Sequence, residues 1–475
     1  MLLVKLLVCQ CQNNFVLLCF CAASGFREYF IFFAVSMSPK KKNAANTSQE
    51  ELSKLDKKDL IARIIQLEAQ NFQLKNIISK NLSETDSKKY AKKEKKQLDF
   101  SKFHFRRVLL RIVYFGWDYH GLVVQIDTNQ TIEHHLFQAL TKSCLIQSKE
   151  TSNYHRCGRT DKGVSSFGQV ISISLRSKFP PSQQYSEQAI DNEMSYCKML
   201  NRLLPKDIKA VAWMPIPENM PQFSARFDCN KRTYKYYFPR SSLDIKAMRS
   251  ACVHLKGSHD FRNLCKMDVG NGVVQFRREI LNVDVIPVNH EDVELPTSMY
   301  YFLIVGNAFL WHQIRCIMGV LLLIGERKES PEVFTELLDV ERHPRKPQYN
   351  MASDLPLNLF HCSYNLPGPG WRYDKLQLSE MLAQLQTGWT LQNIKTTMIK
   401  EVINEIESEY LKVCGSEMAD TDRVVAYTDC LIQGVKSKVY TPLLERPTCC
   451  NLDQRLKVLS EARISLDMLQ TVTHP

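Results

Sequence analysis

The sequence has no pair of cysteines at CxxC spacing, although it contains 16 cysteines in 475 residues. Structural zinc sites are usually built from such pairs, or from cysteine and histidine pairs at matching spacing. His155 with Cys157, and His361 with Cys362, have no second half at that distance along the chain. The sequence therefore predicts no metal site. Cysteines scattered through a large basic chain also favour reduced thiols over a disulfide framework.

The sequence also has no apolar run long enough to cross a bilayer. In the first 36 residues, the apolar stretches 2–9 and 15–23 are split by polar residues at 10 and 12–14, whereas a spanning helix needs about 20 consecutive apolar residues. No arginine precedes Arg27, and a second methionine follows at Met37. We predict that 1–36 is an apolar leader of doubtful status: a non-structural or misassigned leader, a signal or anchor segment, and an organellar presequence all stay open. We expect no membrane partner, and a location in the nucleus and/or cytoplasm with a mitochondrial pool if the presequence reading holds.

Negative charge is in the minority: 50 Asp and Glu face 62 Lys and Arg, which gives a net charge of +12. Clustered cations release counterions from a phosphate backbone and attract it over long range. The composition therefore predicts a polyanionic partner without saying which one. An apolar fraction of 44% over this length supplies material for two hydrophobic cores.

Segment 37–104 combines a heptad pattern with a basic run. The heptad core positions are apolar apart from one asparagine: Leu60, Ile64, Leu67, Asn71, Leu74 and Ile78. This pattern predicts a short coiled coil or an amphipathic helix packed on its own domain. The basic run consists of Lys88, Lys89, Lys92, Lys93, Lys95 and Lys96. A solvated linker, RNA contact and nuclear import all stay open for it.

The most informative stretch is the run CGRTDKGV from Cys157 to Val164, followed by an alternating segment at 169–175. Glycines on both sides of Asp161 let the backbone turn just before a strand begins. Such a turn presents one carboxylate at the edge of a sheet, where it can act in a cleft. By spacing alone, Arg159 and Asp161 are also typical of an ordinary surface or capping ion pair.

This stretch resembles the catalytic motif of tRNA pseudouridine synthases of the bacterial synthase A superfamily. Cys157, Lys162 and Phe167 most resemble the eukaryotic branch that modifies positions 38 and 39 of the anticodon stem-loop. Later segments match the same branch in the same order: 223–227, 232–238, 257–268, 307–319 and 346–349. The resemblance covers the chain from about Phe105 to about Tyr364.

The resemblance implies a reaction without a cofactor and with tRNA as partner. It implies that Asp161 acts either as a nucleophile at C1′ or as a base at C2′ of the uridine, kept ionised by Arg159 and Arg315. It implies that Tyr234 stacks on the uracil, although a packing role is the ordinary one for a strand tyrosine. His312, Arg315 and Gly319 share one helix face, which would aim the arginine away from the core. The expected substrate-binding residues are Lys162, Arg226, Arg232, Tyr236 and His312.

Periodicity predicts an α+β fold with mixed or antiparallel sheets flanked by helices. The expected strands are 107–115, 169–175, 211–214, 233–238, 273–288 and 300–306. The expected helices are 132–140, 190–204, 245–255, 310–326, 331–340 and one or two within 376–411. The resemblance implies two RNA-recognition-like domains, 105–215 and 216–365, with joined sheets. A helical and basic extension (37–104) precedes them and a helical or partly disordered tail (366–475) follows.

Two other classes of function compete with a pseudouridine synthase. A non-catalytic RNA-binding module or tRNA chaperone would use the same basic surface and sheet. A leucine-zipper DNA-binding protein is excluded by order, because its basic region precedes the heptads and here the lysine run follows them. A homodimer through the heptad helix or through the catalytic domains is also expected.

Overall fold

The computed structural model describes residues 6–11, 14–19, 73, 98–414, 427–435 and 439–461. The chain divides into two compact units, 1–93 and 94–475. In the first unit, β1 (Leu6–Cys11) pairs antiparallel with β2 (Asn14–Cys19). Gln73 is helical and exposed. The rest of the predicted heptad helix and the whole Lys88–Lys96 run lie outside the described residues.

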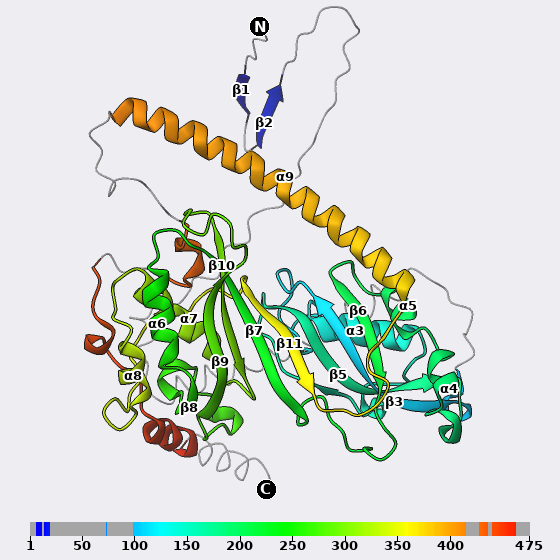
Figure 1. Ribbon diagram of the computed structural model, residues 1–475. Coiled ribbons are helices and arrows are strands. Elements are labelled where there is room, and N and C mark those ends of the chain that lie inside the picture. Colours follow the sequence, from blue (N-terminus) through cyan, green and yellow to red (C-terminus); the bar gives the residue numbers. More distant parts are fainter. Residues whose placement is uncertain are drawn as a thin grey trace, which may run out of the picture. The chain divides into compact units, whose positions relative to one another are not determined.

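The second unit is built on one mixed sheet, whose path runs β12-β6-β3-β5-β11-β7-β10-β9-β8, with β4 beside β5 (Figure 1). The parallel pair on this path is β5 with β11; the other pairs are antiparallel. The strands are β3 (His104–Tyr114), β4 (His155–Arg156), β5 (Ser165–Ser177), β6 (Ile208–Pro215), β7 (Cys229–Pro239), β8 (Gly257–Asp260), β9 (Arg277–Pro287), β10 (Met299–Gly306), β11 (Leu357–Tyr364) and β12 (Arg372–Tyr373).

Helices flank this sheet, so the predicted α+β class with a mixed sheet is confirmed. They are α3 (Ile132–Lys142), α4 (Glu187–Asp191), α5 (Tyr196–Asn201), α6 (Ile245–Val253), α7 (Gln313–Gly325), α8 (Val333–Leu338), α9 (Lys375–Cys414) and a helix at 452–461. Short 3-10 helices lie at Phe100–Lys102, Glu150–Ser152, Pro181–Gln183, Arg262–Leu264, Val269–Asn271, Asp429–Leu431 and Leu443–Glu445. Among 98–414, 427–435 and 439–461, no helix is both long and apolar enough to span a membrane.

Most predicted elements are present, and α3 begins where its cap was expected, since the Thr131 hydroxyl accepts a hydrogen bond from the His134 amide at 3.3 Å. The single helix expected over 190–204 is wrong, because α4 and α5 are separate. Between them, the buried carboxylate of Glu193 accepts bonds from the Lys178 amide (3.0 Å) and the Met194 amide (2.9 Å). These bonds to a buried charge hold the chain in a non-helical turn.

One row of residues across the sheet joins the strands of the two sequence halves. Ser166 of β5 pairs with Tyr114 of β3 on one side and with Leu359 of β11 on the other. Leu359 also pairs with Tyr234 of β7. The row therefore sets the start of β5, and the loop just before it, two strands away from Tyr234.

Candidate active site

Asp161 lies in the loop between β4 and β5, and backbone bonds hold that loop in place. The Thr160 carbonyl accepts a bond from the Leu122 amide at 3.1 Å, and the Gly163 amide donates to the Tyr119 carbonyl at 3.1 Å. Gly163 has φ +77°, a conformation that L side chains rarely adopt. The sequence thus turns sharply after Asp161, whose side chain remains 30% exposed. The loop presents a carboxylate that a ligand can reach.

The residues just before α7 meet this carboxylate. Nε2 of His312 lies 3.4 Å from Oδ2 of Asp161. The indole of Trp311 donates a hydrogen bond to the same carboxylate. His312 has φ +58°, so the chain turns abruptly into the helix at this point. Asp161 is therefore contacted by two consecutive side chains from the other half of the sequence.

The surroundings of Asp161 have opposing effects on its pKa. Burial raises the pKa of Asp161, while the positive charge of Arg315 and the hydrogen bond from Trp311 lower it. Asp354 then raises this pKa and Lys266 lowers it. The net effect is a pKa above the ordinary value for aspartate. The charge of Arg315 thus offsets part of the effect of burial on this pKa.

Arg315 is buried, with 3% of its surface exposed. Its Nε donates to the Ala352 carbonyl at 2.9 Å, and the Ala352 amide donates to the Arg315 carbonyl at 3.0 Å. Its Nη2 atom is buried and has no hydrogen-bond partner among the described residues. A side chain built on Gly319 would lie 2.7 Å from the Asn350 carbonyl, so glycine lets segment 350–352 pack on the helix. The expectation that Arg315 is aimed away from the core is wrong, because this segment covers its face of α7.

His312 is uncharged near neutral pH. Burial, followed by the positive charges of Arg315 and Lys266, lowers the pKa of His312 to about 4. Its 3.4 Å contact with Asp161 is therefore not an ion pair at pH 7, although it would become one on protonation. A neutral imidazole still has one N–H that can donate to the carboxylate.

Tyr234 is buried in β7, with 8% of its surface exposed. Its ring meets the ring of Phe309 edge to face, with centroids 5.2 Å apart and planes at 80°. Burial raises the pKa of Tyr234 well above its ordinary value, so the phenol is neutral. The packing role of an ordinary strand tyrosine is present. Its expected contact with uracil stays a prediction.

The other predicted site residues divide into two groups. Lys162, Arg226 and Arg159 are exposed, and Arg159 makes no ion pair with Asp161 in the described part of the chain. Arg232 is buried, and its guanidinium donates to the carbonyls of Cys157 (2.9 Å), Arg226 (2.8 Å) and Asn307.

Tyr236 is also buried, with 0% exposed, and its hydroxyl donates to the Leu431 carbonyl at 3.5 Å. The structure therefore shows Arg232 and Tyr236 holding backbone segments, and their expected contacts with substrate stay predictions. Arg159 has no visible part in holding Asp161.

Three residues at this site were not predicted: Trp311, Lys266 and Asp354. The ammonium of Lys266 lies 4.2 Å from the centre of the Trp311 ring, which places both beside Asp161. For Trp311 and Lys266, the only signal in the sequence was that each lies in a matched segment, where neither was given a role. Asp354 lies outside those segments, and only the folded chain brings it to Gly163, where an added Cβ would lie 2.8 Å from its Oδ2.

A late segment of the chain, 427–435, supports the loop that packs on Arg315. The Ser353 amide donates to the Leu431 carbonyl at 2.7 Å, and the Gln433 amide donates to the Met351 carbonyl at 3.1 Å. The Gln433 side chain donates to Oδ1 of Asp354 at 3.3 Å. The sequence suggested no chemical role for this tail. The structure connects it to the two groups, Arg315 and Asp354, that shift the pKa of Asp161.

Known proteins resemble this chain over most of its length. Residues 251–365 match the family model described as tRNA pseudouridine synthase. The chain is 41% identical to the tRNA pseudouridine(38/39) synthase of Mus musculus, over 89% of this chain and 91% of that protein. It is 42% identical to the Homo sapiens protein of the same name, over 84% of this chain and 86% of that protein. The Saccharomyces cerevisiae protein of that name is 38% identical, over 66% of this chain and 72% of its own length.

Proposed function

The chain belongs to the tRNA pseudouridine synthases, and we propose that it isomerises uridine to pseudouridine at positions 38 and 39 of the tRNA anticodon stem-loop. The observation that carries this proposal is the reachable carboxylate of Asp161, contacted by Trp311 and His312 and influenced by buried Arg315. The relatives named for positions 38 and 39 cover most of this chain, which supports the choice of target.

The reaction is internal to the nucleotide. The N1–C1′ bond breaks, the uracil turns, and C5 bonds to C1′, while the C5 proton is lost and N1 gains one. Asp161 serves as a nucleophile at C1′ or as a base at C2′, and either route needs the ionised carboxylate. Arg315 favours that form by its charge, since its effect on the pKa of Asp161 is downward. No cofactor takes part in this scheme.

The base must leave its stack to reach Asp161, at a cost of a few kcal/mol. Exposed Arg226 and Lys162 would contribute phosphate contacts, and Arg159, also exposed, would join them. Tyr234, two strands from the start of β5, would meet the flipped uracil. The two sequence halves, 105–215 and 216–365, act as RNA-recognition-like domains in this proposal. One hydrophobic cluster lies wholly within 105–215, which supports that division, whereas the other draws mostly on 216–365 and also includes Leu109 and Val170 of the first half.

Oligomeric state and location are also proposals. Helix α9 exposes apolar side chains at Leu391, Ile394, Met398, Val402 and Ile406, which recur every three or four residues and so share one face. A homodimer through the heptad helix or the catalytic domains stays a prediction, and this face of α9 offers a further surface for it. Residence in the nucleus and/or cytoplasm, with a mitochondrial pool, stays a prediction.

A tritium-release assay tests the proposed reaction. Purified protein is incubated with tRNA transcripts whose uridines carry tritium at C5, because that hydrogen leaves only when C5 bonds to C1′. Release should require uridine at position 38 or 39 and should stop when both are changed to cytidine. Binding without release would favour the RNA-binding module or tRNA chaperone.

The acid limb of the pH profile should belong to Asp161. The pKa of Asp161 is raised, so kcat/KM should fall with acidification at a higher pH than a free aspartate would cause. His312 is neutral down to about pH 4, so the variant His312→Gln should keep this limb. Profiles of both proteins on one tRNA provide the measurement. Disappearance of the limb in the variant would assign it to His312 instead.

Removal of the lysine run should weaken binding without changing the chemistry. A chain that starts at Gln97 lacks all six lysines from Lys88 to Lys96. Its tRNA affinity should fall and its salt dependence should become shallower, by a slope of about 1 for each lost phosphate contact. A chain that starts at Met37 is the matched control and should bind and turn over like the full chain. An unchanged affinity and slope would make the run a solvated linker.

Loss of the tail contact should lower turnover more than tRNA binding. Gln433→Pro removes the amide that bonds Met351 and the side chain that bonds Asp354. We expect a fall of about tenfold in single-turnover rate with tRNA affinity within about twofold, since the loop on Arg315 loosens. Val435→Ala is the control, because that side chain is 93% exposed. Equal rates for both variants would contradict a supporting role.

A further inference from the structure

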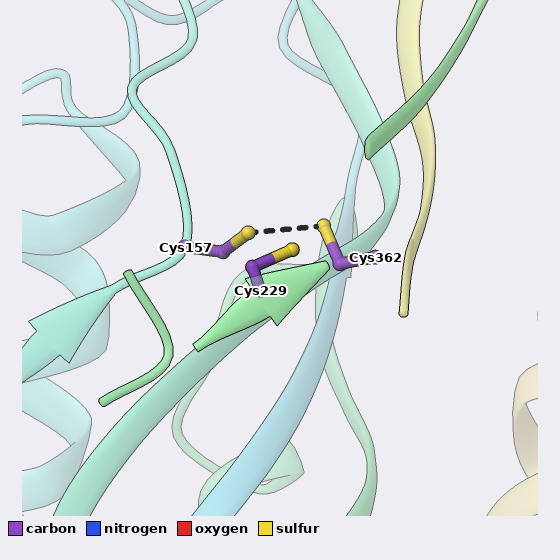
Figure 2. A group of neighbouring side chains, drawn as sticks. All are labelled: Cys157, Cys229 and Cys362. Atoms are coloured by element: carbon purple, nitrogen blue, oxygen red, sulfur yellow. Dashed lines mark hydrogen bonds between the residues drawn. The ribbon is translucent and has the colours of Figure 1, made fainter. Parts of the chain in front are cut away.

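Three cysteines that are far apart in the sequence meet in the folded chain. Cys157 directly precedes the catalytic loop, Cys229 begins β7, and Cys362 lies in β11. Their sulfur atoms all lie within 4.8 Å of one another. The sulfurs of Cys157 and Cys362 are 3.3 Å apart, and Figure 2 shows the three side chains pointing toward one another. We call these residues the thiol cluster.

Backbone hydrogen bonds and strand pairing hold the segments that carry the thiol cluster. The Cys157 amide donates to the Val170 carbonyl of β5 at 2.8 Å. Strands β7 and β11 are paired, and Cys229 lies opposite Tyr364, two residues from Cys362. All three cysteines are less than 9% exposed. The sulfurs are therefore held together by the sheet and shielded from water.

The spacing suits a metal ion bound by three thiolates. Zinc–sulfur bonds are about 2.3 Å long, and three such bonds to one ion set the sulfurs about 3.8–4.0 Å apart. The Cys157 and Cys362 sulfurs are 3.3 Å apart and no pair of the three is more than 4.8 Å apart, so sub-ångström side-chain shifts bring them to that separation. The prediction of no metal site relied on spacing along the chain, which cannot detect ligands from three distant segments.

The charge around the thiol cluster also suits a cation with three thiolates. The Arg232 guanidinium, bonded to the Cys157 carbonyl at 2.9 Å, would offset the net negative charge of three thiolates with one cation.

We propose that Cys157, Cys229 and Cys362 bind a thiophilic d10 cation, Zn²⁺ or Cu⁺, in a structural site. Soft thiolate ligands select these two ions from the available metals. Binding forms three metal–sulfur bonds and releases the thiol protons to solvent, with no change of oxidation state. The ion ties Cys157, which directly precedes the catalytic loop, to β11 and to β7, the strand that carries Tyr234.

Metal titration of the full chain tests this proposal directly. The protein is purified under reducing, anaerobic conditions, and its zinc and copper contents are measured by elemental mass spectrometry. It is then stripped with a chelator and titrated with Cd²⁺ and, separately, with Cu⁺, while sulfur-to-metal charge-transfer absorption is recorded. We expect one ion per chain and an absorption that reports three thiolates. The elemental analysis decides between zinc and copper as the resident ion.

Single substitutions assign the ligands. Cys157→Ser, Cys229→Ser and Cys362→Ser should each lower the absorption by about a third and weaken metal binding by at least about tenfold. Cys252→Ser is the matched control, since that thiol is buried at 2% exposed and lies outside the thiol cluster; it should bind like the parent. If a variant fails to fold, the titration of the parent protein still decides.

Three results would overturn the site. They are no charge-transfer absorption in the reduced, folded parent, unchanged absorption in all three ligand variants, or a Cys157–Cys362 disulfide as the state isolated from cells.

Discussion

Replacing Asp161 with asparagine should abolish pseudouridine formation and leave the protein folded and able to bind tRNA. The amide keeps the shape of the side chain and its capacity to accept a hydrogen bond from Trp311. We therefore expect stability and tRNA affinity within about 1 kcal/mol of the parent. An amide can act neither as a nucleophile nor as a base, so turnover should be lost under either route. Tritium release under single-turnover conditions, beside thermal unfolding and tRNA binding, measures the three properties.

Asp354→Asn is the matched control, because it changes a second carboxylate, whose negative charge raises the pKa of Asp161. Removing that charge lowers the pKa of Asp161, so this variant should remain active and its acid limb should move to lower pH. Residual turnover of Asp161→Asn within about tenfold of the parent would refute its catalytic assignment.

Replacing Arg315 with methionine should produce the second largest loss of turnover, about 100-fold or more. Methionine keeps an apolar stem in a buried position but removes the charge that lowers the pKa of Asp161. It also removes the donor to the Ala352 carbonyl, so a stability loss of about 1–3 kcal/mol is expected from the unsatisfied acceptor. The measurements are single-turnover rate, tRNA affinity and unfolding temperature.

Arg226→Met is the matched control for Arg315→Met, because it removes an exposed arginine. It should weaken tRNA binding and leave the single-turnover rate near that of the parent. If Arg315→Met instead lost binding and kept its rate, Arg315 would be a phosphate contact. Arg315→Lys separates the effect of charge from that of geometry. Because lysine keeps the charge, its single-turnover rate should exceed that of Arg315→Met, and because it lacks the fork of the guanidinium, the rate should stay below that of the parent.

The sequence predicted those parts of the fold that short-range patterns determine. Alternation identified the segments that become β3, β5 and β7, and the cap at Thr131 identified α3. The sequence could not predict the break between α4 and α5. The Glu193 carboxylate in this break accepts hydrogen bonds from Ser177 and Lys178, which lie in an earlier segment of the chain. That interaction exists only after the chain has folded.

In the candidate site too, the sequence predicted what lies in local motifs and missed what depends on contacts between distant segments. Asp161 and Arg315 were identified because each lies in a matched motif. Arg315 was expected to face outward because its helix was considered without segment 350–352, which covers it. Asp354 and the tail segment 427–435 carry no motif, and their part in the site depends on hydrogen bonds between distant segments.

Tyr236 shows a further reason why a motif does not define a contact. It lies in the matched segment 232–238, and the sequence suggested substrate binding. Tyr236 and Tyr234 lie two residues apart in β7 and so on the same face, and Tyr236 is fully buried with its hydroxyl bonded to the Leu431 carbonyl. The motif could not show this contact with segment 427–435, because it forms only in the folded chain.

Mapping pseudouridine at single-nucleotide resolution in small RNA tests the central claim most directly. The RNA comes from cells that lack this protein, and from the same cells after return of the parent protein or of Asp161→Asn at equal abundance. Pseudouridine at tRNA positions 38 and 39 should be absent without the protein, should return with the parent, and should stay absent with Asp161→Asn. Unchanged pseudouridine at both positions in the cells that lack the protein, or its full return with Asp161→Asn, would contradict the account.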